Sequence, residues 1–91
     1  MIKIVWSNGN VETPIEDSFR IIPEGNRARI SFKVSKCVSR GISNAGYGIE
    51  PGECTIMFDD NPVDFGSCTV SELLLAQDRY RVERALEKIH A

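Results

Sequence analysis

Polar and apolar residues alternate most clearly in the stretch Arg27-Ala28-Arg29-Ile30-Ser31-Phe32-Lys33-Val34. Its even-numbered residues are apolar and its odd-numbered residues are basic or hydroxylic, which is the period of two of a strand with one buried face. Residues 19–22 precede it across Pro23-Glu24-Gly25-Asn26, a segment typical of a turn. The stretch therefore predicts an antiparallel hairpin at the centre of the fold.

Two further hairpins are predicted on either side of this one. Residues 2–6 alternate and return through residues 11–13 across Asn8-Gly9, a pair that favours tight hairpin turns with φ > 0 at both residues. Residues 54–58 also alternate, and Asp60-Asn61-Pro62 predicts a turn into residues 63–65. The first two-thirds of the chain is thus expected to be mainly β-structure.

The segment 41–52 interrupts this pattern. It holds four of the seven glycines and, with the residues just before it, shows no clear periodicity. Long loops in compact domains are usually functional or mobile. The sequence therefore predicts a glycine-rich functional loop over 41–52, with Tyr47 near its centre.

A helix is predicted from about residue 70 to residue 89. Thr69 and Glu72 have the spacing of a capping box. The broadest apolar face is expected to cover the sheet, and it comprises Val70, Leu74, Leu75, Val82, Ala85, Leu86 and Ile89. Leu73, Ala76 and Tyr80 form a separate stripe, which either widens the core or provides a second interface, for a partner protein or a second copy. Asp78 falls within the main apolar face, where it either marks the end of the sheet or caps a loop.

These elements predict a single α+β domain over residues 1–91: a small antiparallel sheet of about five or six strands, built from hairpins and packed on one C-terminal α-helix. No apolar run approaches the roughly 18 residues of a membrane span. The first residues are too short and too alternating for a signal peptide. A cytoplasmic protein without membrane contact is expected, in the host cytoplasm if a phage encodes it.

Composition argues against an enzyme. The one histidine is His90, next to the C-terminus, where chains usually fray. Cys37, Cys54 and Cys68 include no Cys-x-x-Cys pair, so neither a metal site nor a cofactor is predicted. Reduced, buried thiols are expected, with a Cys37–Cys54 disulfide as the alternative.

The formal net charge of −2 conceals strong segregation. Residues 20–40 hold six bases and one acid, whereas residues 41–78 hold seven acids and no base. The basic strand 27–36 within residues 20–40 is interpreted as a solvated sheet face or as a surface for nucleic acid or a phosphorylated small molecule, acting with the glycine-rich loop 41–52. The phosphate-binding candidates are Arg27, Arg29, Lys33 and Arg40.

The acidic segment is interpreted as a solvated face or as a docking surface for a basic protein, including host nucleic-acid-binding machinery. Together with the second helix stripe and the loop, it supplies the candidate partner-binding residues. These are Asp59, Asp60, Asp64, Leu73, Tyr80 and Tyr47.

The stretch Asp60-Asn61-Pro62-Val63-Asp64-Phe65-Gly66-Ser67-Cys68-Thr69-Val70-Ser71-Glu72-Leu73 resembles the hairpin-then-helix segment of small tailed-phage head-to-tail joining proteins. The resemblance covers residues 54–90 and implies a phage-like protein that works by binding other proteins. The profile of size and acidity is also similar to that of anti-CRISPR-type phage inhibitors. The leading expectation is a non-enzymatic protein-interaction module of phage or mobile-element origin, either an inhibitor of a host defence protein or an assembly factor.

Overall fold

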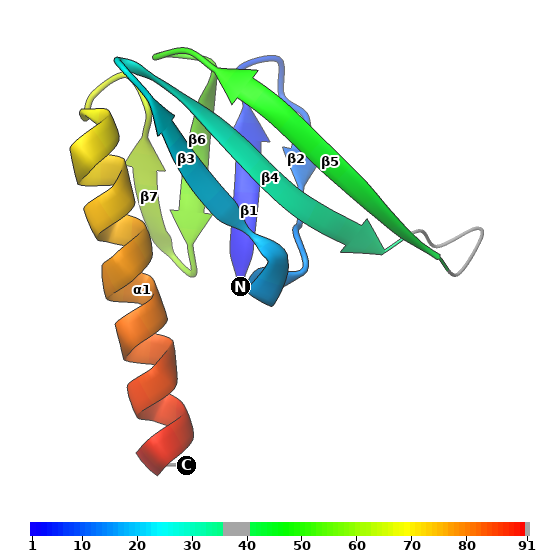
Figure 1. Cartoon of the computed structure of the whole chain (residues 1–91), viewed down its shortest axis with the longest axis vertical. Helices are drawn as coiled ribbons and strands as arrows, with labels where there is room; N and C mark the ends of the chain where they lie inside the picture. Colours follow the sequence, from blue (N-terminus) through cyan, green and yellow to red (C-terminus); the bar gives the residue numbers. More distant parts are fainter. Residues whose placement is uncertain (36–40, 91) are drawn as a thin grey trace.

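The computed structural model describes residues 1–35 and 41–90, which form two antiparallel sheets and one long C-terminal helix (Figure 1). The first sheet has the order β2-β1-β6-β7 and the second has the order β3-β4-β5. The strands are β1 (Ile2–Trp6), β2 (Val11–Glu12), β3 (Arg20–Glu24), β4 (Arg27–Ser35), β5 (Ile42–Ile49), β6 (Cys54–Phe58) and β7 (Asn61–Asp64). A short 3₁₀-helix, η1 (Glu16–Ser18), connects the sheets, and α1 (Val70–His90) ends the described chain.

The predicted α+β class and the C-terminal helix are confirmed. The prediction of one sheet with five or six strands is wrong, because the described residues contain seven strands in two sheets. The chain crosses from one sheet to the other through η1 after β2, and returns between β5 and β6. Adjacent hairpins in the sequence therefore do not all share a sheet.

The three predicted hairpins all form. The β3–β4 turn carries Gly25 at φ 66°, and the β1–β2 turn carries Gly9 at φ 93°. Asn8 does not share the positive φ expected of an Asn-Gly turn, because four residues, Ser7 to Asn10, connect β1 to β2 in place of a two-residue turn. The Gly9 amide donates to the Trp6 carbonyl and the Trp6 amide donates to the Asn10 carbonyl, which leaves only the glycine in the left-handed region.

The predicted loop over 41–52 is instead mostly a strand. β5 pairs with β4 from Ile42 opposite Ser35 to Ile49 opposite Ala28. Its alternate residues Ala45, Tyr47 and Ile49 face the core side, while Gly46 and Gly48 occupy the outer side. The nine-residue β4 presents a long edge, and pairing with β5 satisfies its backbone groups.

The core lies between the inner faces of the two sheets, and α1 lies along one side. The inward residues of β4 are those predicted, with Ala28, Ile30 and Phe32 buried and Val34 partly buried. Phe19 joins the layers, because its ring centroid lies 6.4 Å from both Phe32 of the second sheet and Phe58 of the first.

Phe19→Ala is expected to destabilise the fold by about 3–5 kcal/mol, since it leaves a cavity where the two sheets meet. Val11→Ala, at a side chain that is 55% exposed on β2, should change the free energy of unfolding by no more than about 0.5 kcal/mol. Urea unfolding measures both. A loss below about 1 kcal/mol for Phe19→Ala would contradict a central role for this ring.

Candidate functional site

The side of α1 that faces the core is determined by buried residues that begin near the start of the helix. The predicted capping box forms: the Glu72 amide donates to Thr69 Oγ1 over 3.2 Å, and the Thr69 amide donates to Glu72 Oε1 over 3.3 Å. From there Leu73 is fully buried and Tyr80 is only 5% exposed. The prediction that Leu73 and Tyr80 offer a partner-binding stripe is therefore wrong, because these side chains face the core.

Tyr80 is held at both ends of its side chain. Its ring centroid lies 5.4 Å from that of Phe58, and its hydroxyl donates to Glu16 of η1. The Met1 ammonium donates to the Tyr80 oxygen over 2.7 Å, and Arg84 Nη2 lies 3.3 Å from Glu16 Oε2. This cluster fastens the middle of α1 to the start of β1 and to η1.

The opposite stripe of α1 is exposed. Leu75, Val82, Leu86 and Ile89 are 63%, 58%, 49% and 74% exposed. The prediction that this face covers the sheet is wrong for these four residues, whereas Val70 is buried and Leu74 packs against the core. The helix also continues past both sheets (Figure 1), and none of residues 81–89 is buried. We call these four residues the exposed stripe. Asp78 lies on this outward side and is exposed, so it does not cap a buried loop.

The predicted acidic residues do not form one patch. Asp59, at φ 56°, lies 2.5 Å from the Met1 ammonium, and Asp60 is exposed beside it in the β6–β7 turn. Asp64 lies at the other end of β7, where Ser67 Oγ donates to its Oδ2 over 3.0 Å. Two of the three carboxylates thus have partners within the protein.

Tyr47 lies on β5, not in a loop. Its ring makes an edge-on contact with Trp6, with centroids 5.1 Å apart, and its hydroxyl donates to Glu12 over 3.2 Å. Trp6 belongs to β1 and Glu12 to β2, so Tyr47 bridges the two sheets. Its 39% exposure leaves part of the ring on the surface of a hollow of about 590 Å³.

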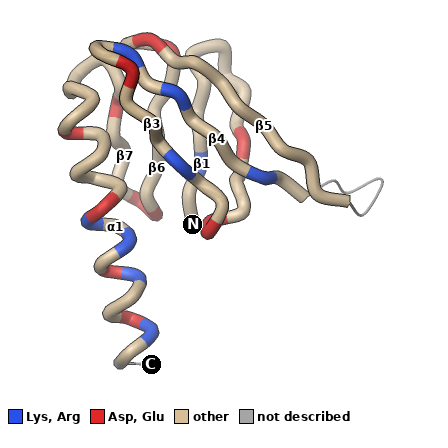
Figure 2. The backbone as a smooth tube through the Cα atoms, in the orientation of Figure 1, with Lys and Arg blue, Asp and Glu red and all other residues tan. Residues whose placement is uncertain are grey.

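The basic residues of β4 face outward as predicted, and Figure 2 shows them following the strand. Arg27 Nη2 lies 3.3 Å from Glu50 Oε1, and Arg29 Nε lies 3.3 Å from Glu24 Oε1. These acidic partners reduce the positive field over half of the predicted phosphate surface. Lys33 is exposed on the same face. Arg40, the fourth candidate, lies outside the described residues.

A cavity of about 410 Å³ lies between α1, β3 and η1, and sequence reasoning did not predict it. Arg20, Gln77, Arg81 and Lys88 contribute to its lining. Arg81, Arg84 and Lys88 recur at helical spacing in the second half of α1, but no sequence pattern places Arg20 of β3 opposite them.

The described cysteines lack the environment of a nucleophile. Burial raises the pKa of the Cys54 thiol to about 11, with Glu53 and Asp64 adding to the rise. Burial also raises the pKa of Cys68. Both thiols are reduced, and Cys37, the other partner of the alternative disulfide, lies outside the described residues.

Among residues 1–35 and 41–90, no group of three or more His, Cys, Asp or Glu side chains has the arrangement of a metal site. Within the same ranges, no helix combines the length and apolar character that crossing a bilayer needs.

Comparison with known protein families, curated proteins and solved structures finds no match to this chain. The resemblance to head-to-tail joining proteins and to phage inhibitors therefore stays a prediction.

Glu16 is expected to make the fold acid-sensitive. The hydrogen bond from Tyr80, opposed by burial and reinforced by the Met1 ammonium and Arg84, lowers the pKa of Glu16 from its ordinary 4.5. Because the folded-state pKa is the lower one, this stabilisation is complete above pH 4.5 and is lost as pH falls through the folded-state pKa.

The free energy of unfolding of Glu16→Gln, measured by urea unfolding between about pH 3 and pH 6, should therefore decrease less with falling pH than that of the parent; this decrease is called the acid limb. Asp60→Asn, at an exposed turn carboxylate, serves as the matched control and should leave that limb in place. An unchanged acid limb in Glu16→Gln would show that the Tyr80–Glu16 contact does not govern it.

Proposed function

We propose that this protein is a non-enzymatic protein-interaction module whose docking element is the projecting half of α1. The observation that carries the proposal is the exposed stripe, Leu75, Val82, Leu86 and Ile89, on a helix that extends past both sheets. Contiguous exposed apolar surface on a small domain usually marks an interaction site.

The spacing of the stripe favours a particular mode of binding. Val82, Leu86 and Ile89 stand at i, i+4 and i+7, the positions with which an amphipathic helix enters an apolar groove. A free-standing helical segment of about ten residues is only marginally stable in water. Enclosure by a groove removes the stripe from water and also stabilises the last turns.

The proposed occupant is therefore the apolar groove of another protein. Charged side chains of both signs border the stripe, namely Asp78, Arg79 and Glu83, all of them exposed. Such a border suits the polar rim that surrounds the apolar centre of most interfaces. Because the two signs are mixed, the partner's rim needs neither a strongly acidic nor a strongly basic field.

The sequence resemblance suggests two roles for such a module, inhibition of a host defence protein and assembly of a phage particle. Both roles require the protein to bind another protein and neither requires catalysis, so the exposed stripe supports the two roles equally. The identity of the bound protein separates them: a host nuclease or nucleic-acid-binding protein indicates an inhibitor, and a virion protein indicates an assembly factor.

A photo-crosslinking residue introduced at Arg79, beside the stripe, tests the groove directly. The crosslinked protein is identified by mass spectrometry and purified, and its affinity is then measured by titration calorimetry. Leu86→Glu is expected to weaken binding by at least about tenfold, because it places a charge in an apolar site. Val11→Glu, at a similarly exposed apolar side chain on β2, should bind like the parent.

Equal affinities of the Leu86→Glu and Val11→Glu variants would contradict the proposal. Sedimentation of the isolated protein tests the other occupant: a dimer that Leu86→Glu dissociates would show that a second copy covers the stripe, which also overturns the groove. Circular dichroism should show both variants folded.

A further inference from the structure

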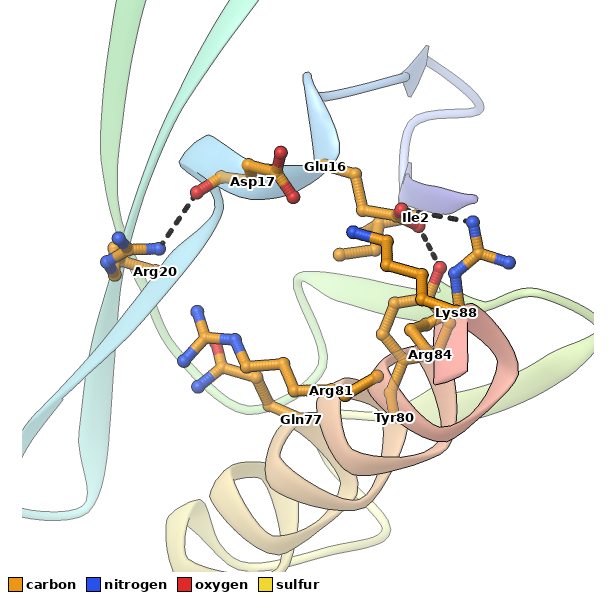
Figure 3. Close-up of a pocket in the computed structure, with 10 residues that line it drawn as sticks. Ile2, Glu16, Asp17, Arg20, Gln77, Tyr80, Arg81, Arg84 and Lys88 are labelled. Carbon is orange, nitrogen blue, oxygen red and sulfur yellow. Dashed lines mark hydrogen bonds and ion pairs between the residues drawn. The ribbon is translucent and has the colours of Figure 1, made fainter. Parts of the chain in front are cut away.

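The cavity between α1, β3 and η1 lies beside the core-facing stripe of the helix (Figure 3), and no residue of the exposed stripe lines it. Four basic side chains line it, of which Arg84 pairs with Glu16 and Glu87; of the other three, Arg20 begins β3, while Arg81 and Lys88 belong to α1. None of the three has a carboxylate within 4.0 Å among the residues that the structure describes. The cavity thus gathers positive charge that the described residues do not neutralise through direct ion pairs.

Two of these cations are drawn together by one backbone atom. The Phe19 carbonyl accepts from Arg20 Nη1 over 3.0 Å and from Arg81 Nη2 over 2.7 Å. Like charges that share an acceptor repel one another, and the attraction of an anion placed between them offsets this repulsion. Each guanidinium also has further N–H groups that point in a fixed, forked arrangement.

The floor of the cavity carries a second sign of a missing partner. Gln77 is 5% exposed, and its Oε1 has no hydrogen-bond donor among the described residues. Buried side-chain oxygens in native proteins nearly always have one, so this atom lacks a donor group such as a hydroxyl, which a phosphate ester dianion does not itself carry. Arg84 Nε, from the same wall, is likewise buried without an acceptor.

We propose that this cavity binds the phosphate group of a small phosphorylated molecule, with Arg20, Arg81 and Lys88 as its ligands. A phosphate dianion offers three oxygens, enough for two guanidinium forks and one ammonium. The volume of about 410 Å³ exceeds what a phosphate alone fills and lies within the range of small-molecule sites. Ile2 and Ala85 supply an apolar wall for the rest of the molecule.

Two acidic residues, Glu16 and Asp17, also line the cavity, and neither prevents phosphate binding. Glu16 is engaged by Tyr80, Arg84 and the Met1 ammonium, so its charge is compensated within the protein. Asp17 is exposed, where water screens its carboxylate. A long nucleic-acid track is disfavoured, because the three cations line a single hollow and the arginines of β4 have carboxylate partners.

The test titrates the ¹⁵N-labelled protein with inorganic phosphate, ribose 5-phosphate and ribose at constant ionic strength and about pH 8, where phosphate is a dianion. Both phosphates are expected to shift the amide signals of Phe19 to Ile21 and of Gln77 to Lys88, together with the Gln77 side-chain amide. Ribose is expected to shift none of them. Binding of inorganic phosphate with exclusion of ribose 5-phosphate would contradict a site for a phosphorylated molecule, and no shift with either phosphate would overturn the proposal.

Variants locate the site. Arg81→Gln and Lys88→Gln are each expected to weaken ribose 5-phosphate binding by about tenfold or more, because each removes a charge-assisted hydrogen bond. Arg79→Gln removes the same charge from the same helix, but Arg79 lines a different hollow beside Phe58 and Glu83, so its affinity should match that of the parent. Equal losses in Arg79→Gln and Lys88→Gln would show a general charge effect and overturn the site. Lys88 is exposed, so Lys88→Gln keeps the test decisive if Arg81→Gln does not fold.

Discussion

The packing of Tyr80 determines the rotation of α1, and the positions of both proposed binding surfaces depend on that rotation. The ring needs the apolar surface of Phe58, and the hydroxyl needs an acceptor because a buried polar atom without one is costly. Glu16 supplies the acceptor, and Arg84 in turn pairs with Glu16. If α1 were rotated by half a turn, the Tyr80 ring would be exposed to water. The partly buried Glu16 carboxylate would then lose the hydrogen bond that it accepts from Tyr80.

With the rotation fixed in this way, opposite sides of one helix acquire different surroundings. The side that bears Tyr80 continues into Gln77, Arg81 and Arg84 and forms one wall of the cavity. The other side presents Leu75, Val82, Leu86 and Ile89 to water. Both surfaces belong to α1, so a protein that binds the projecting turns would lie close to the cavity.

Local sequence signals predicted the hairpins, the helix bounds and the capping box, because each depends on neighbours within a few residues, as Gly25 and Thr69 show. The same alternation was present in β5 at Ala45, Tyr47 and Ile49, but the glycines between them concealed it. The division into two sheets and the rotation of α1 depend on contacts such as Phe19–Phe58 and Tyr80–Glu16. Residues that far apart leave no periodic signal. The cavity was missed for the same reason, since Arg20 and Arg81 meet only at the Phe19 carbonyl.

The helix departs from the pattern that stability alone would favour. Gln77 Oε1 and Arg84 Nε are buried without partners among the described residues, while four large apolar side chains remain in water. An apolar residue in place of Gln77 would bury more apolar area and would remove a buried oxygen that has no donor. In sequences that fold well, the hydrophobic pattern and the hydrogen bonding usually agree with the fold. Positions that depart from this agreement are concentrated at functional sites. Here both departures lie on α1, one on each side: exposed apolar surface on one, and on the other the basic lining of the cavity with Arg84 Nε, which has no acceptor among the described residues.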